Sequence, residues 1–199
     1  MTAKNYLGDI IGGGIMLRDS RLIAQLLLQY PDDKAWEHAI VEENLLQKNS
    51  THSAKRMAAT ARKRLESMPD DFLSDLLNAP DDLAKQMLML AILCQSPVLM
   101  DFMLTEVADA RRMYREAMRN DDWADFFSSR QRVITGLDQY SDSSVQKMGS
   151  NVFKILVDVG YLESARNKRL KNIYVLPEIR EWSVRLNCPK AYEAMEAAR

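Results

Sequence analysis

The side chains best suited to bind a ligand in this sequence lie between residues 144 and 171. A helix predicted over residues 144–159 has an apolar stripe that includes Met148, Val152 and Ile155. The opposite face of this helix has amide, hydroxyl and ammonium groups and no carboxylate. Its members are Gln146, Lys147, Ser150, Asn151 and Lys154. Such side chains bond to the phosphates and base edges of nucleic acids, so the pattern favours binding chemistry over catalysis.

A basic segment follows this helix. Residues 161–175 predict a β-hairpin, because apolar residues alternate around Ile173 and Val175 after a polar turn at 166–168. Its basic side chains, set against the single acid Glu163, are Arg166, Lys168, Arg169 and Lys171. A polar-faced helix with a basic two-stranded wing is the outline of a winged helix, in which the helix enters the major groove and the wing contacts the backbone. The alternative is a solvated helix face beside an ordinary charged turn.

A second basic helix is predicted over residues 52–67. Small residues, among them Ala54, Ala58 and Ala61, form a narrow apolar stripe that allows close packing. The basic side chains on the rest of its surface are Lys55, Arg56, Arg62, Lys63 and Arg64. With two predicted helices before it, this helix fits a helix-turn-helix arrangement that contacts phosphates. The alternative is a solvated basic helix paired with neighbouring aspartates.

No group of residues has the spacing of a catalytic or metal site. His38 and His52 are isolated, and Cys94 and Cys188 lie far apart outside any CxxC pattern, so free buried thiols are expected. The Gly12–Gly14 tract lacks the Gly-Lys-Ser/Thr ending of a phosphate-binding loop. We therefore predict no enzymatic activity, no metal and no cofactor.

The elements that must position these side chains are mainly α-helical, since the chain has only seven Gly and six Pro. After a loosely held arm of fourteen residues, helices are predicted over residues 17–29, 33–46, 52–67, 70–78, 81–95, 97–119, 122–132, 144–159, 177–186 and 189–199. Three regions are expected: a helix-turn-helix-like region over 1–68, a helical middle over 69–134 that packs the two ends, and a winged-helix-like region over 135–199.

No membrane-spanning segment is expected. The longest apolar run, Met87–Cys94, is far shorter than the roughly 20 residues needed to cross a bilayer and indicates a buried helix. The N-terminus lacks the apolar centre of a signal peptide. These features predict a cytoplasmic protein without membrane contact.

In the order and spacing of several short segments the chain resembles the BrxA family, encoded in BREX bacteriophage-exclusion systems. The segments are GGGIMLRDSR at 12–21, ENLLQK at 43–48, SAKR at 53–56, RLE at 64–66, DFM at 101–103, Trp123 with Phe126 and Phe127, SVQK at 144–147, and ILVDVGYL at 155–162. Each segment alone is weak, but together they cover nearly the whole chain.

The resemblance implies a small helical accessory protein that binds DNA. BREX systems methylate host DNA at a short non-palindromic site and block phage replication. Their DNA methyltransferase, phosphatase-like protein and large ATPase are candidate partners. The family offers no catalytic motif to carry over. It has also been described as an inner-membrane protein, which conflicts with the absence of a spanning segment in this sequence.

Three hypotheses about function remain open. The leading one is a non-enzymatic accessory factor that binds duplex DNA with little sequence preference. Since the net charge is −1, such binding must depend on local basic patches. The second is an adaptor that assembles other BREX proteins, which near-zero net charge and twelve methionines would suit. The third is an RNA-binding helical module, although no aromatic platform of the RNP type is present.

Overall fold

Helix α6 (Asp81–Gln95) lies at the centre of the fold. The computed structural model describes residues 2–199. In α6 every residue of Met87–Leu93 is buried, so no side of this stretch faces solvent. A helix that is apolar all round must be surrounded by other elements. The other helices are therefore arranged around α6, and the mainly α fold class is confirmed.

The remaining elements are short helices. The α-helices are α1 (Ala3–Leu7), α2 (Leu17–Leu27), α3 (Asp33–Glu37), α4 (Thr51–Leu65), α5 (Asp70–Asn78), α7 (Pro97–Phe102), α8 (Ala108–Arg112), α9 (Asp122–Gln131), α10 (Asp142–Val159), α11 (Pro177–Arg185) and α12 (Pro189–Ala197). The 3₁₀ turns are η1 (Ile10–Gly12) and η4 (Leu137–Gln139), and the π-helical turns are η2 (His38–Glu42) and η3 (Met103–Val107).

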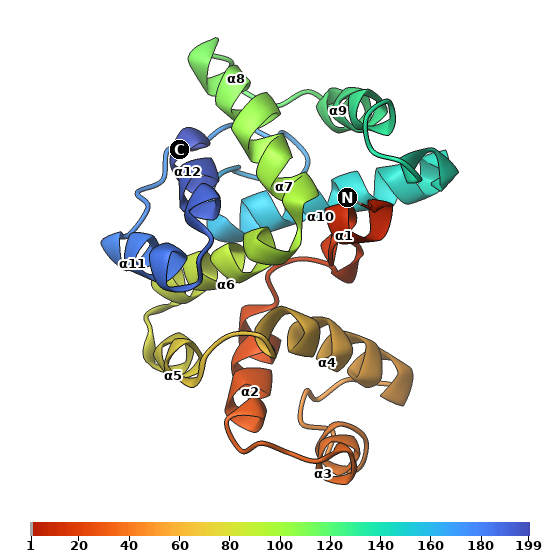
Figure 1. Cartoon of the computed structure of the whole chain (residues 1–199), viewed down its shortest axis with the longest axis vertical. Coiled ribbons are helices and arrows are strands. Elements are labelled where there is room, and N and C mark those ends of the chain that lie inside the picture. Colours follow the sequence, from red (N-terminus) through yellow and green to blue (C-terminus); the bar gives the residue numbers. More distant parts are fainter. Residues whose placement is uncertain (1) are drawn as a thin grey trace.

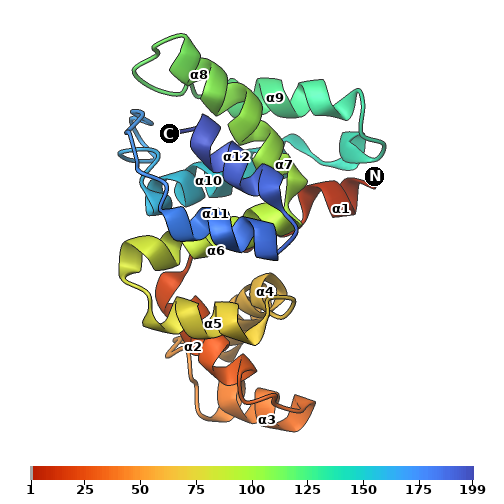
Figure 2. The same cartoon turned by 60° about the vertical axis from the view of Figure 1, so that its left-hand side comes forward.

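These helices form two tiers. Helices α2 to α5 lie together at one end, whereas α1 and α7 to α12 lie together at the other (Figure 1). Helix α6 packs against members of both tiers, including α2, α4 and α5 on one side and α7, α10, α11 and α12 on the other. The same arrangement is seen after rotation (Figure 2). The expected region boundaries after residues 68 and 134 stay a prediction.

The N-terminal segment is not a loose arm, so that expectation is wrong. Helix α1 packs against α7, and η1 packs against α10. Tyr6, Leu7 and Ile10 are buried, and the Tyr6 hydroxyl donates a hydrogen bond of 2.8 Å to Asp101. Helix α1 therefore belongs to the tier of α7 to α12, and residues 8–16 connect it to the tier of α2 to α5. Sequence periodicity does not reveal this packing, because each buried stretch here is too short to show a helical period.

Arg64 of α4 fixes the crossing segment. Its side chain is 1 % exposed, and its Nε donates to Asp9 Oδ2 at 2.9 Å. The two terminal nitrogens donate to the backbone carbonyls of Gly14, at 2.6 Å, and Gly13, at 3.1 Å. Burial lowers the pKa of the Arg64 guanidinium, and the charge of Asp9 opposes this shift. We name residues 8–15 the strap, since they lie between α4 and α10.

The helix expected over residues 97–119 ends earlier, at Arg112. Helices α7 and α8 run on through η3 as one rod, and the backbone then turns at Tyr114, which has a φ of 52°. The Arg115 N–H donates to the Ala110 carbonyl across this turn, which is the hydrogen bond of a Schellman cap. An Asn or Gly usually marks such a cap, so a tyrosine there hides the helix end. The helix expected over 33–46 is likewise shorter, since it ends with η2.

The expected β-hairpin at 161–175 is not formed, since no strand occurs within residues 2–199. Only isolated antiparallel bridges join Leu162 to Leu170 and Ala117 to Arg169. The part expected to pair around Ile173 and Val175 is irregular because α6 supplies its hydrogen bonds. Gln86 donates to the Tyr174 carbonyl at 3.0 Å and accepts from the Leu176 N–H at 2.9 Å. A side-chain amide thus takes the place of a partner strand.

Among the described residues, no single helix is long and apolar enough to cross a membrane. Helix α6 and the α7–α8 rod together have the length and the apolar composition of a membrane span, but the two are bent by 108° relative to each other.

Removing the Arg64 guanidinium should destabilise the fold strongly. Arg64→Met leaves the buried Asp9 carboxylate and two glycine carbonyls without their donor, and breaking such a pair lowers the free energy of unfolding by about 3 kcal/mol or more. Urea denaturation measures the change. Lys63→Met is the matched control, because Lys63 is half exposed and its ion pair with Asp9 is loose, at 3.9 Å. Its loss should lower the free energy of unfolding by less than about 1 kcal/mol. Equal effects of the two substitutions would contradict the assigned role of Arg64.

Candidate nucleic-acid interface

Helix α10 provides the polar face expected from the sequence. Ser141 caps its first turn by accepting a hydrogen bond from the Ser144 N–H, and Gly160, with a φ of 104°, ends it. The predicted apolar stripe is confirmed, since Met148, Val152 and Ile155 are fully buried. Packing of this stripe fixes the rotation of α10, so the opposite face must point outward.

Most side chains on the polar face of α10 reach solvent. Gln146, Lys147, Ser150 and Lys154 are exposed. Asn151 is different, because its amide donates to the carbonyls of Ile10, at 3.1 Å, and Ile11. Asn151 therefore holds the strap against α10 and has few donors left for a ligand.

The turn at 164–168 stands beside α10 and is built by side-chain hydrogen bonds. Ser164 Oγ accepts from the Asn167 N–H at 3.2 Å, and the Lys168 N–H returns to the Ser164 carbonyl. Lys168 has a φ of 47°, an uncommon conformation for a residue with a side chain. This backbone directs its ammonium inward, to 2.5 Å from Asn120 Oδ1 and 5.0 Å from the Phe153 ring centroid. Lys168 therefore joins the turn to α9 and α10.

The other basic residues of this segment point to solvent. Arg166 and Lys171 are exposed. Arg169 is also exposed and lies 3.9 Å from Glu163, a contact too loose to neutralise it firmly. Together with Lys147 and Lys154 on α10, these side chains form a set that we name the α10 surface. Two of its members have carboxylates nearby, since Arg169 lies next to Glu163 and Lys154 lines a cavity together with Asp158.

A cavity of about 390 Å³ opens on the α10 surface. It lies between α9, α10 and the 164–168 turn, and we name it the α9–α10 cavity. Its walls are formed by Asn120, Trp123, Ala124, Val145, Gln146, Gly149, Ser150, Phe153, Ala165 and Lys168. Two of the residues that line it, Asn120 and Trp123, are not among the candidate site residues predicted from the sequence. Gly149, a glycine in the middle of a helix, is the sequence signal that could have marked it, because it indicates a close approach of another element.

Helix α4 has its small residues inside and most of its basic residues outside. Ala54, Ala58 and Ala61 are buried, as predicted. Several basic side chains have partners within the protein. Lys55 lies 2.5 Å from Glu37, and the Arg62 guanidinium lies 4.5 Å from the Trp36 ring centroid.

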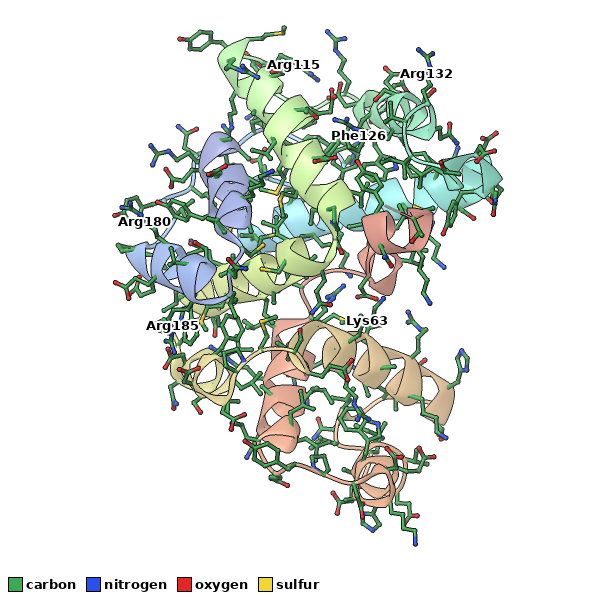
Figure 3. The ribbon with its side chains drawn as sticks, viewed as in Figure 1. Lys63, Arg115, Phe126, Arg132, Arg180 and Arg185 are labelled. Carbon is green, nitrogen blue, oxygen red and sulfur yellow. The ribbon has the colours of Figure 1, made fainter. Side chains whose placement is uncertain are left out.

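Two other basic side chains of α4 differ from these in their surroundings. Arg56 is exposed, with no ion-pair partner within residues 2–199. Lys63 is exposed at the gap between the tiers, where it donates to the Gly8 carbonyl at 3.3 Å (Figure 3).

The expectation that Arg64 contacts DNA is wrong. Its side chain is buried and its nitrogens donate to the strap, so it supplies a structural contact. Helical spacing could not separate it from Lys63, because a long cationic side chain next to an apolar stripe can turn either way. The strap does, however, connect the two helices, because Arg64 of α4 and Asn151 of α10 both donate hydrogen bonds to its backbone.

A profile of the BrxA family matches residues 4–185. The chain belongs to the BrxA family. BREX protein BrxA of Escherichia coli O9:H4 (strain HS) is 37 % identical over 98 % of this chain and 92 % of its own length. BREX protein BrxA of Paramagnetospirillum magneticum is 32 % identical over 90 % of each chain. Membership in this family identifies a component of BREX phage defence.

A crystal structure with the same fold supports this relationship. An uncharacterized protein from Magnetospirillum magneticum superposes with a TM-score of 0.85, with 29 % sequence identity, over 97 % of this chain and 99 % of that chain. The two chains therefore share the fold described above over nearly all of their residues.

The two cysteines form a separate cluster, although they are far apart in sequence. Cys94, near the end of α6, and Cys188, just before α12, hydrogen-bond to each other through their thiols, and both are partly buried. The bond from Cys94 lowers the pKa of the Cys188 thiol to about 7, while burial opposes this shift. The same bond, together with burial, raises the pKa of Cys94. Both cysteines are free, in agreement with the sequence-based expectation.

Substitution of Cys94 should make Cys188 less reactive near neutral pH. Cys94→Ala removes the hydrogen bond that stabilises the Cys188 thiolate, so the pKa of Cys188 rises and its alkylation profile moves to higher pH. The rate of iodoacetamide modification against pH, followed by mass spectrometry, measures this shift. In the control Cys188→Ala, the remaining thiol should react slowly. An unchanged profile in Cys94→Ala would show that the two thiols do not interact.

Proposed function

We propose that this chain is a non-enzymatic DNA-binding component of a BREX system and that the α10 surface contacts duplex DNA. The observation that carries the proposal is the composition of this surface. Exposed Lys147 and Arg166 project from a helix and an adjacent turn that also expose Gln146 and Ser150, and exposed Lys154 lies one turn further along the helix, near Asp158. Lysine and arginine neutralise phosphates, and amides and hydroxyls bond to base edges.

The chain order around α10 supports a winged-helix-like arrangement. The α7–α8 rod is followed by the bridge residue Ala117, then by α9 and α10, and then by the bridges at Leu162 and at 169–170. The Met118 N–H donates to the Lys168 carbonyl at 3.0 Å, so three chain segments lie side by side at the base of the 164–168 turn. In this proposal α10 enters the major groove and the turn contacts the phosphate backbone.

Helix α4 supplies a second, weaker phosphate contact in this proposal. Arg56 is exposed without an ion-pair partner in residues 2–199, and Lys63 has only a loose one in Asp9. Lys55 must first leave Glu37, and Arg62 must leave Trp36 and Glu66. The succession of α2, α3 and α4 supports a helix-turn-helix-like arrangement in this proposal. Because phosphate contacts carry no sequence information, we expect little sequence preference from this surface.

Binding of duplex DNA should depend steeply on salt and on the cations of the α10 surface. Each phosphate contact contributes about −0.9 to the slope of log K against log salt, so Lys147→Ala/Arg166→Ala should make the slope less steep by about 2 and weaken binding at low salt. Fluorescence anisotropy of a labelled duplex at several salt concentrations measures both quantities. Lys190→Ala, which removes an exposed lysine of α12, is the control and should change neither.

Two outcomes would reject DNA binding through this surface. The unaltered protein would bind the duplex no better than a neutral control protein at low salt. The second rejecting outcome is that Lys147→Ala/Arg166→Ala and the control Lys190→Ala weaken duplex binding equally. Competition with double-stranded RNA of the same length tests the RNA-binding hypothesis in the same assay, since preferential displacement by RNA would favour it.

A protein partner is the second candidate function, because the end of α8 presents two large apolar side chains to solvent. Met113 is 73 % exposed and Tyr114 is 93 % exposed. Adjacent exposed apolar residues mark interaction sites more often than single ones do. The other BREX proteins, namely the methyltransferase, the phosphatase-like protein and the ATPase, are the candidate partners.

Met113→Ser/Tyr114→Ser should therefore reduce capture of a BREX protein in a pull-down while leaving DNA binding intact. The apolar side chains at the end of α8 would supply contact area that serine cannot. Tyr174→Ser, which removes another exposed tyrosine, is the control. If both variants capture each purified BREX protein as well as the unaltered chain does, the end of α8 is not the adaptor surface.

A further inference from the structure

We infer that the α9–α10 cavity binds a single unpaired nucleobase, an inference that rests on the proposed DNA binding of the α10 surface. The cavity volume of about 390 Å³ falls within the range of small-molecule sites. Its mouth is formed in part by Gln146 and Ser150, which belong to the polar face of α10. A nucleic acid on that face therefore lies directly over the opening.

The charge of the cavity wall favours a ligand attached to a polyanion. Its only ionic side chain is Lys168. Four other surface cavities of the described chain each have at least one carboxylate in the wall, such as Glu43, Asp81 or Asp158. A carboxylate would repel a nearby phosphate, so the α9–α10 cavity is the one whose wall suits a nucleotide.

The polar groups of the wall match the edge of a base. The Gln146 amide offers donors and an acceptor, the Asn120 amide offers donors, and the Ser150 hydroxyl offers an acceptor. The Ser150 hydroxyl donates to the Gln146 backbone carbonyl, and the Lys168 ammonium donates to Asn120 Oδ1 and has further donors. Base edges likewise carry alternating donors and acceptors, and amide side chains pair with them in two-point contacts. An aliphatic side chain of a protein partner would leave these groups unpaired.

The floor of the cavity is apolar and is held in place by close packing. Trp123 is 3 % exposed, and its indole nitrogen donates to the Val145 carbonyl at 2.8 Å. A Cβ at Gly149 would lie 2.5 Å from the Trp123 ring, so only glycine allows this ring to lie against α10. Phe153 completes the floor from the next turn of the helix. A rigid apolar floor under polar walls suits a flat heterocycle with a polar edge.

Lys168 forms one side of the cavity, and its backbone has an uncommon left-handed conformation. Its φ of 47° is sparsely populated for a residue with a side chain, and its ammonium is held between Asn120 and the Phe153 ring. Such conformations persist where the surrounding structure fixes them, often at ligand sites. Because the ammonium is on the wall, it can turn from Asn120 to a base oxygen or nitrogen without a change in the fold.

A base inside a duplex cannot reach the cavity, since stacking and pairing keep it in the helix. A bulged base has already lost its pairing. A duplex with one bulged base should therefore bind the unaltered protein about tenfold more tightly than the perfect duplex, as expected for one additional base contact. Fluorescence anisotropy at fixed salt measures both affinities. A 2-aminopurine at the bulge should also become protected from acrylamide quenching when the protein is added.

Ala124→Leu/Ala165→Leu fills the cavity from two sides without removing a polar group. It should bind the perfect duplex as before and lose the preference for the bulge. Ala197→Leu, an equal change at an exposed position of α12, is the control and should keep the preference.

Equal affinity of the unaltered protein for the two duplexes, or an unprotected 2-aminopurine, overturns the inference while leaving DNA binding in place. Retention of the preference by a folded Ala124→Leu/Ala165→Leu also overturns it, because a base could not then occupy the cavity. If neither duplex binds, the proposed function itself fails together with the inference. The quenching measurement requires no variant, so the inference stays testable even if the filled cavity does not fold.

Discussion

The buried guanidinium of Arg64 is the interaction on which the rest of the structure depends. It holds Asp9 and the carbonyls of Gly13 and Gly14, and so ties α4 to the segment that connects the two tiers. An arginine suits this position because its fixed fork of donors can satisfy a carboxylate and two carbonyls at once. From the other side, Asn151 and Asp158 of α10 bind the same segment. The strap thus sets where α10 stands relative to α4.

Most of the helices follow from sequence periodicity and helix-end signals. The apolar stripe of α10 and the small-residue stripe of α4 are both buried as predicted, because a stripe of apolar residues leaves a helix only one way to pack. The errors lie where tertiary contacts override local patterns. Gln86 draws residues 174–176 away from strand pairing, and Tyr114 ends a helix whose pattern continues. Neither effect is visible within a window of neighbouring residues.

The candidate site was only partly predictable for a related reason. Helical spacing identifies which side chains share a face, and four of the five side chains expected on the polar face of α10, all except Asn151, are exposed. It does not show which cations are already neutralised. Arg64 is buried, Lys55 contacts Glu37, and Lys168 turns inward to Asn120. These pairings join residues far apart in sequence, so the number of available cations depends on the fold and not on the composition.

The strap also has a consequence for how the chain reaches its native state. The Ile15 N–H donates to Asp158 across 143 residues of sequence, and Tyr6 reaches Asp101 across 95. On a ribosome, α2 to α5 can assemble long before α10 has been synthesised. Residues 8–15 reach their place only after α10 has been made, so closure of the strap is a late, high-contact-order event. Until that closure the nascent protein has its helices but not the relative placement of α4 and α10.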